Sequence, residues 1–172
     1  YNAGVRIGQL TYNKQNSIGT GCTEISNGGL TYHGIDVVHR MNECGMIVDL
    51  SHCGTKTTLD AIEKTSRPPA FTHTFGQKLS DHKRGKSEEE LKALKDNDGY
   101  MGVLALPSFI APNKENPDLD DLLDHIDYAT SILGTDRVGI GTDWGMTSPD
   151  VPEPLHSGPD DFFTDSGFRD SK

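Results

Sequence analysis

Two short apolar runs, each ending on a histidine, place the strongest constraint on the fold of this chain of 172 residues. One run extends from Met46 to His52 and the other from Pro69 to His73, so the histidines lie 21 positions apart. The segment between them has the length of one short helix, which indicates a strand–helix–strand unit. If both strands belong to one parallel sheet, their carboxyl ends face the same way and the two imidazoles converge. Neutral imidazole is the commonest metal ligand, so the pair predicts half of a zinc site.

Strand and helix patterns alternate along most of the chain. We expect strands at 5–12, 46–51, 70–72, 100–106 and 138–142. We expect helices at 32–44 and 55–64, a third opened by the capping box of Ser87 and Glu90, and a fourth from Asn116-Pro117 to Leu133. This order fits an open doubly wound sheet or part of a (β/α)8 TIM barrel.

Two observations favour the barrel. Tyr12, His52, His73 and Asp143 all fall at the carboxyl ends of predicted strands, where barrel enzymes carry their active sites. The glycine-rich turn of dinucleotide-binding sheets is absent from the sequence. A complete barrel takes about 250 residues and five strands do not close one, so we expect the back portion of a larger barrel. We expect residues 1–146 to form this partial α/β barrel domain and 147–172 to be its incomplete loop or tail.

The formal net charge of −10 restricts the class of partner. Nucleic acids and anionic membranes are disfavoured, because binding them depends on lysine and arginine. The sequence contains no apolar run long enough for a membrane segment and no signal-peptide pattern at Tyr1, and the missing initiator methionine suggests further residues upstream. Three cysteines without a C-x-x-C spacing argue against a disulfide framework and favour a reducing, cytoplasmic location.

Two further residues are candidates for the chemistry. Asp143 follows a strand with two glycines, and it is either a metal-facing carboxylate or general base, or the N-cap of the next helix. Arg84 lies in the loop after the His73 strand. It is either part of a solvated basic turn or the group that binds a substrate carboxylate through two hydrogen bonds.

The remaining histidines have simpler interpretations. His125 and Asp127 form an H-x-D pattern, but within a helix two positions differ by roughly 200° around the axis and cannot share a metal. We interpret that pair as structural. His33 and His39 lie on the first predicted helix and are expected to be solvated or capping, while His156 falls in the tail and is expected to be inert.

Six segments, taken in order, resemble a known family. They are Gly4-Val5-Arg6, Leu10-Thr11, Ile47-Val48-Asp49-Leu50-Ser51-His52, Phe71-Thr72-His73, Asp81-His82-Lys83-Arg84 and Val138-Gly139-Ile140-Gly141-Thr142-Asp143. Together they resemble the membrane (renal-type) dipeptidases, peptidase family M19, which are zinc enzymes of the amidohydrolase-like barrel superfamily.

The resemblance implies a role for each candidate. His52 and His73 match the two histidines that bind the family's second zinc ion. Arg84 matches the arginine that holds the carboxylate of the dipeptide, and Asp143 matches the acid that handles protons at the metal-bound water. Tyr12 occupies the place of a histidine that steadies the tetrahedral intermediate, and a phenol can also donate a hydrogen bond to an oxyanion.

The resemblance also implies what lies outside the chain. The family's strand-borne H-x-D and its zinc-bridging glutamate come from the first three barrel strands, upstream of Tyr1, so the chain corresponds to strands four to eight. We therefore expect a dipeptidase with two zinc ions per intact site, and a 172-residue chain that is inactive by itself. The alternatives are a metal-dependent amidohydrolase acting on another amide or a lactone, and an inactive truncated or binding protein. A homo-oligomer is possible under each of these hypotheses.

Overall fold

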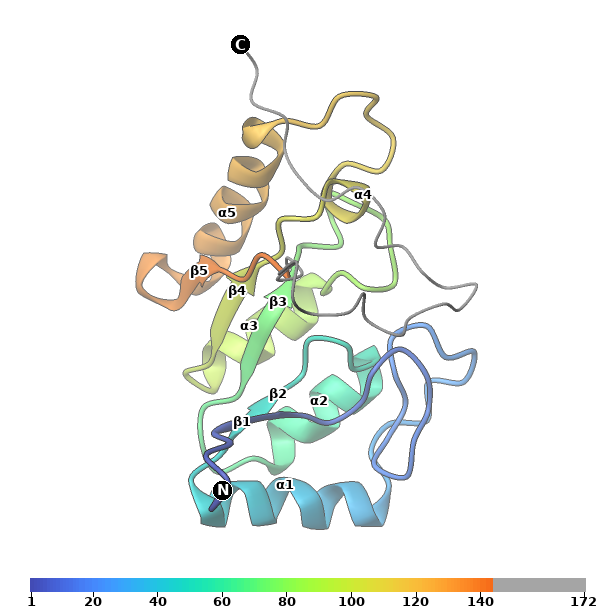
Figure 1. Ribbon diagram of the computed structural model, residues 1–172, viewed down its shortest axis with the longest axis vertical. Coiled ribbons are helices and arrows are strands. Elements are labelled where there is room, and N and C mark those ends of the chain that lie inside the picture. Colours follow the sequence, from blue (N-terminus) through green and yellow to red (C-terminus); the bar gives the residue numbers. More distant parts are fainter. Residues whose placement is uncertain (144–172) are drawn as a thin grey trace, which may run out of the picture.

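The computed structural model describes residues 1–143, in which the strands follow one another across a parallel sheet in chain order (Figure 1). The strands are β1 (Ile7–Gln9), β2 (Ile47–Asp49), β3 (Ala70–Thr74), β4 (Tyr100–Val103) and β5 (Val138–Ile140). The helices are α1 (Tyr32–Cys44), α2 (Thr55–Lys64), α3 (Glu88–Asp96), α4 (Pro107–Ile110), α5 (Leu119–Leu133) and the 3₁₀ turn η1 (Thr135–Arg137).

The sequential strand order determines where the helices lie. Each crossover moves one strand further in the same direction, and right-handed crossovers then put the connecting helices on one face of the sheet. Neighbouring helices pack side by side, α1 on α2, α2 on α3 and α3 on α5 (Figure 1). The arrangement confirms the predicted α/β fold, a part of a (β/α)8 barrel with its helices outside.

The two faces of the sheet differ in polarity and cover. Toward the helices, the strand residues Val48, Phe71 and Met101 are buried. They form one core with residues from the helices and loops, including Val38, Ile62, Leu91, Leu94 and Leu122. On the other side Ile7 and Ile47, which are paired in register, remain 46% and 40% exposed.

The local signals for helix ends are confirmed. The Thr31 hydroxyl accepts a hydrogen bond from the Gly34 N–H at 3.0 Å and begins α1. Gly45 ends this helix in the left-handed region, at φ 73°. Ser87 and Glu90 form the predicted capping box of α3.

Several boundaries differ from the prediction. The strands expected at 5–12 and 100–106 pair only over the shorter ranges of β1 and β4, and α4 was not predicted. The long helix begins at Leu119 rather than at Asn116-Pro117. The reason is a stronger cap: Asp118 accepts hydrogen bonds from the N–H groups of Asp120 and Asp121, and the Asp121 carboxylate accepts from Asp118 N–H.

Part of the predicted organisation lies outside the described residues. The tail at 147–172 and His156 are in this part, and the domain boundary at 146 stays a prediction. Within residues 1–143, none of the helices combines the length and the hydropathy needed to cross a bilayer.

Candidate metal centre

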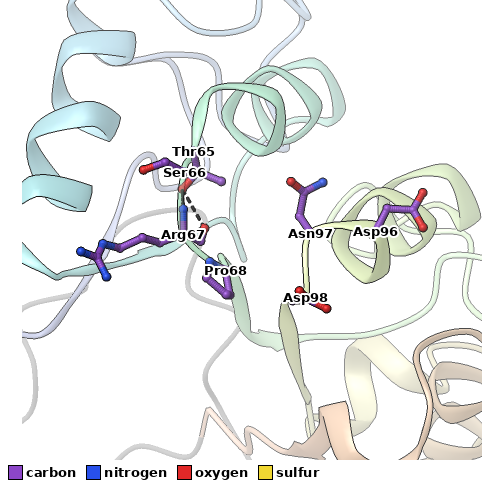
Figure 2. Close-up of a pocket in the computed structure, with 7 residues that line it drawn as sticks. All are labelled: Thr65, Ser66, Arg67, Pro68, Asp96, Asn97 and Asp98. Atoms are coloured by element: carbon purple, nitrogen blue, oxygen red, sulfur yellow. Dashed lines mark hydrogen bonds between the residues drawn. The ribbon is translucent and has the colours of Figure 1, made fainter.

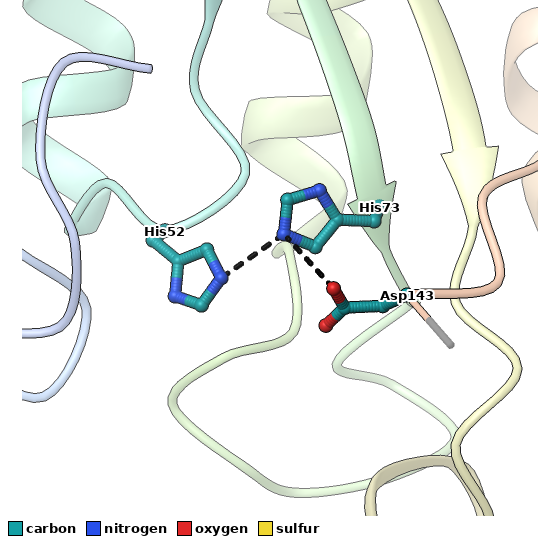
Figure 3. A group of neighbouring side chains, drawn as sticks. All are labelled: His52, His73 and Asp143. Atoms are coloured by element: carbon teal, nitrogen blue, oxygen red, sulfur yellow. Dashed lines mark hydrogen bonds and ion pairs between the residues drawn. The ribbon is translucent and has the colours of Figure 1, made fainter. Parts of the chain in front are cut away.

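Three predicted residues come together at the carboxyl edge of the sheet. His52 follows β2, His73 lies in β3 and Asp143 follows β5, so the parallel strands deliver all three to one edge (Figure 3). Their potential ligand atoms lie within 4.8 Å of one another. The predicted convergence of two imidazoles and a carboxylate is therefore present in the fold.

The two imidazoles have the spacing of neighbouring ligands on one metal ion. Their Nε2 atoms are 3.0 Å apart. Two nitrogens bound to one tetrahedral zinc at about 2.0–2.1 Å would be about 3.3 Å apart. A shift of a few tenths of an ångström is enough to admit the ion, so the two side chains fit a zinc centre.

The other nitrogen of each ring has its own partner. His52 Nδ1 lies 2.8 Å from Asn13 Oδ1, and His73 Nδ1 lies 2.7 Å from Thr72 Oγ1. Such outer hydrogen bonds orient metal-binding histidines and select the ring nitrogen that faces the ion. Sequence reasoning missed Asn13 and Thr72. The signal that could have found them is a polar side chain at a strand end, directly beside a predicted site residue.

Burial and nearby cations keep both rings neutral. The pKa of His52 falls to about 2, first because burial disfavours the imidazolium and then because Arg84, His73 and Lys86 oppose its charge. The pKa of His73 is also lowered, by burial and Arg84, against an opposing effect of Asp143. The neutral imidazole is the form that binds metal.

Asp143 stands beside the histidine pair. Its Oδ1 lies 4.0 Å from His73 Nε2, farther than two ligands of one tetrahedral ion, and its side chain is 31% exposed. Its backbone is in the left-handed region at φ 58°, which is uncommon for a residue other than glycine. Asp and Asn are the residues that adopt this region most readily after glycine, so the carboxylate of Asp143 can occupy this position beside the histidine pair.

Tyr12 lies against the same pair. Its ring stacks on His52 with 4.3 Å between ring centroids, and the side chain is 55% exposed. Partial burial, together with the charge of Asp143, raises the pKa of the phenol. Tyr12 therefore keeps its O–H and can donate a hydrogen bond at neutral pH.

Arg84 is buried behind the site, with 3% of its surface exposed. Its guanidinium donates to the backbone carbonyls of Ser51 and His73, at the ends of the two histidine-bearing segments. Lys86, close by, is also buried and donates to the carbonyl of Cys53 at 2.8 Å. Sequence reasoning missed Lys86, because its burial depends on packing between α2 and α3.

The other histidines take no part in this group. His125 is buried in α5 and its Nε2 lies 3.1 Å from the carbonyl of Ile110, which agrees with a structural role. His33 and His39 are exposed on α1.

The opposite edge of the sheet carries a cavity of about 270 Å³ (Figure 2). It is lined by residues that precede β3 and β4, namely Thr65, Ser66, Arg67, Pro68, Asp96, Asn97 and Asp98. Barrel enzymes place their chemistry at the carboxyl edge, whereas this edge serves stability. Among residues 1–143, the convergent metal-ligand group is the one at the carboxyl edge.

Comparison with known proteins gives the family of this chain. Residues 1–156 match the family model described as membrane dipeptidase, peptidase family M19. The chain belongs to this family. A dipeptidase of Schizosaccharomyces pombe, itself described as uncharacterized, is 36% identical over 149 residues, which make up 84% of this chain and 36% of the relative.

Solved structures share the fold. An amidohydrolase from Pseudomonas aeruginosa superposes with a TM-score of 0.80 at 39% identity, over 86% of this chain and 45% of that one. A metallo peptidase from Rhodobacter sphaeroides, solved with a phosphinate mimic of the dipeptide L-Ala-D-Ala, has a TM-score of 0.77 at 23% identity over 83% and 43% of the two chains. This M19 chain thus spans less than half the length of these three proteins.

Proposed function

We propose that this chain supplies strands four to eight of a zinc-dependent dipeptidase, in which His52 and His73 bind one of two zinc ions. The observation that carries the proposal is the 3.0 Å approach of two Nε2 atoms whose Nδ1 atoms already have partners. In the metal-free chain the two nitrogens share a hydrogen bond, and the same spacing suits two nitrogen ligands of one cation. The M19 family and its metallopeptidase members support a dipeptide substrate.

The groups around the pair suit amide hydrolysis. Zinc supplies Lewis-acid chemistry, which polarises a carbonyl group and makes water acidic near neutral pH. In the proposed reaction Asp143 accepts a proton from the attacking water and gives it to the leaving amine. Tyr12 donates its phenolic O–H to the carbonyl oxygen as negative charge develops there. Its raised pKa supports this role, because the donor keeps its proton.

Arg84 is proposed to bind the carboxylate of the dipeptide. A guanidinium has five N–H donors, so the bonds to Ser51 and His73 leave donors that a substrate could use. The buried charge would also attract an anionic substrate into an otherwise acidic protein.

The second candidate is hydrolysis of another amide or a lactone at the same centre. The observation that favours it is the position of Arg84, which is 3% exposed and bonded to two backbone carbonyls. A substrate without a carboxylate would not need this side chain to be accessible. An inactive binding protein is the third hypothesis, and it predicts no turnover with any of these compounds.

Two measurements test the proposal. The first is the coding sequence upstream of Tyr1, where an H-x-D at a strand end would support the two-zinc dipeptidase. The second is an assay of the protein encoded by that longer sequence, with a dipeptide and its C-terminal amide. We expect hydrolysis of the dipeptide, a large loss with the amide, and loss of this preference in Arg84→Met. Equal rates for both compounds would favour the second candidate.

The 172-residue chain is expected to be inactive by itself. Two histidines and a carboxylate do not complete a two-metal site, and β1 and β5 are the sheet edges among the described residues. Robust dipeptide turnover by the purified chain with added zinc would contradict this expectation. The oligomeric state is measured in the same preparation by light scattering.

A further inference from the structure

A buried carboxylate lies directly beneath the histidine pair. Asp49 is 4% exposed and accepts hydrogen bonds on both oxygens. Its Oδ1 accepts from the N–H and the hydroxyl of Ser51 and from the N–H of Thr72, at 3.1, 2.7 and 3.1 Å. Its Oδ2 lies 2.8 Å from Thr72 Oγ1. Ser51 directly precedes His52 and Thr72 directly precedes His73, so Asp49 ties together the two segments that carry the histidines.

The hydroxyl of Thr72 has one proton and three neighbours. They are Asp49 Oδ2 at 2.8 Å, His73 Nδ1 at 2.7 Å and Ser51 Oγ at 3.2 Å. A carboxylate only accepts hydrogen bonds, and bonds to it are the stronger ones, so Thr72 donates its proton to Asp49. The Ser51 hydroxyl is turned the same way by its 2.7 Å bond to Asp49.

The direction of the hydrogen bond from Thr72 to Asp49 determines which ring nitrogen of His73 carries the hydrogen. Because the Thr72 O–H donates to Asp49, the Thr72 oxygen presents a lone pair to His73 Nδ1 at 2.7 Å. The ring nitrogen must then carry the hydrogen, which leaves the lone pair on Nε2, the atom facing His52. In the metal-free chain the 3.0 Å hydrogen bond between the two Nε2 atoms then takes its hydrogen from His52, and the side-chain amide of Asn13 donates to His52 Nδ1.

We propose that Asp49 and Thr72 are positioning residues that hold His73 in the tautomer protonated on Nδ1, so that Nε2 is free to bind a metal ion. The inference rests on the proposed metal centre for its purpose, but the position of the proton is a property of the chain alone. Asp49 acts through the Thr72 hydroxyl and is outside the group of three side chains whose ligand atoms converge.

The Thr72 hydroxyl is tested by Co²⁺ titration of the 172-residue chain. Thr72→Val keeps the shape of the side chain and removes the hydroxyl, and we expect it to weaken Co²⁺ binding by about 10–100-fold. Thr72→Ser keeps the hydroxyl and should bind close to wild type, with the same visible absorption spectrum. Equal affinities in all three proteins would overturn the proposal.

Asp49→Asn tests the direction of the relay. The backbone N–H groups of Ser51 and Thr72 hold the amide oxygen at the Oδ1 position, which puts the NH₂ group beside Thr72. Thr72 must then accept from the amide and donate to His73, which moves the ring hydrogen to Nε2. Nitrogen-15 spectra of the metal-free chain at pH 8 report this directly: Nδ1–H is expected in wild type and Nε2–H in the variant.

The outcomes separate the two proposals. If wild type binds no Co²⁺ but its His73 is protonated on Nδ1, the metal centre fails and the relay stands. If Co²⁺ binds but His73 of the metal-free wild-type chain carries its hydrogen on Nε2, the relay fails and the metal centre stands. If Asp49→Asn does not fold, the Thr72→Val and Thr72→Ser pair decides, because both variants leave the bonds between Asp49 and Ser51 intact.

Discussion

The two edges of the sheet use arginine in similar ways but with different consequences. At the carboxyl edge, Arg84 is buried and donates to the carbonyls of Ser51 and His73. At the amino edge, Arg67 is exposed and donates to the carbonyl of Asn42 at 2.9 Å. The amino edge has a cavity, yet the convergent ligand atoms lie at the other edge.

The difference teaches that the surroundings of a polar group determine what it can do. Charges buried in a low dielectric act strongly on their neighbours, as Arg84 and Lys86 do on His52. Exposed charges at the amino edge are screened by water and salt. A search for cavities alone would select the amino edge, whereas the buried charges and the neutral histidines indicate a functional site at the carboxyl edge.

The largest expected effect is the loss of metal binding on removal of a ligand. His73→Ala leaves one imidazole and a distant carboxylate, so Co²⁺ affinity should fall by more than the roughly 100-fold limit typical of outer hydrogen bonds. The matched control is Arg67→Ala at the amino edge, which should bind Co²⁺ like wild type. Isothermal titration of both variants checks the contrast, and similar affinities would remove the distinction between the edges.

The next effect concerns stability beneath the site. Lys86 Nζ donates to Cys53 O and Thr58 Oγ1 at 2.8 Å and to Glu90 Oε1 at 3.1 Å, in an ion pair whose side chains are both 2% exposed. Lys86→Met leaves Glu90 as an uncompensated buried charge and should cost about 3–5 kcal/mol in the free energy of unfolding.

The control for this variant is the double change Lys86→Met with Glu90→Leu. It removes both charges, so it should lose less stability than the single change, although Ser87 then lacks its capping partner. Urea unfolding measures both proteins. A double variant less stable than Lys86→Met would show that the charge is not the cause.

A smaller effect is expected from steric crowding at the carboxyl edge. A Cβ at Gly141 would collide with the carbonyl of Thr72 and approach the Cα of His73. Gly141→Ala should therefore destabilise the chain by about 1–3 kcal/mol and displace His73, which weakens Co²⁺ binding. Gly28→Ala, where a Cβ would meet only Thr20 Cγ2 at 3.5 Å, is the control with unchanged Co²⁺ affinity.

The smallest effect belongs to the amino edge. Arg137 donates to Asp98 Oδ1 at 2.7 Å, and the Asp98 side chain is 74% exposed. Asp98→Asn removes the charge and keeps a residue that tolerates the local φ of 58°. The expected change in unfolding free energy is less than about 1 kcal/mol, with Co²⁺ binding unaffected. A larger loss of unfolding free energy would mean that ion pairs at the amino edge contribute as much to stability as the buried pair at the carboxyl edge.

Much of the fold could be predicted from periodicity and end signals. The order of strands and helices follows from apolar spacing and from Thr31, Gly45 and Ser87, because these act locally. The Asp118 cap was missed because the preceding Asn-Pro offered a competing start to α5.

The part of the candidate site that could be predicted is the convergence of side chains at the carboxyl ends of parallel strands, because strand direction alone determines it. The spacing of His52 and His73, together with the strand before Asp143, was enough to predict that all three residues lie at the same edge of the sheet. The partners Asn13, Asp49 and Thr72 were not predictable, because their hydrogen bonds depend on how neighbouring segments are placed in space. The burial of Arg84 has the same origin, and its role in substrate binding stays a proposal.

The sequential strand order has a consequence for how the molecule assembles. Each strand pairs with the one made just before it, so every βα unit can dock on finished structure as the chain emerges during synthesis. The segments bearing His52 and His73 would then meet before β5 brings Asp143. Hydrogen exchange on nascent chains stalled before β5 should already show protected amides in β2 and β3.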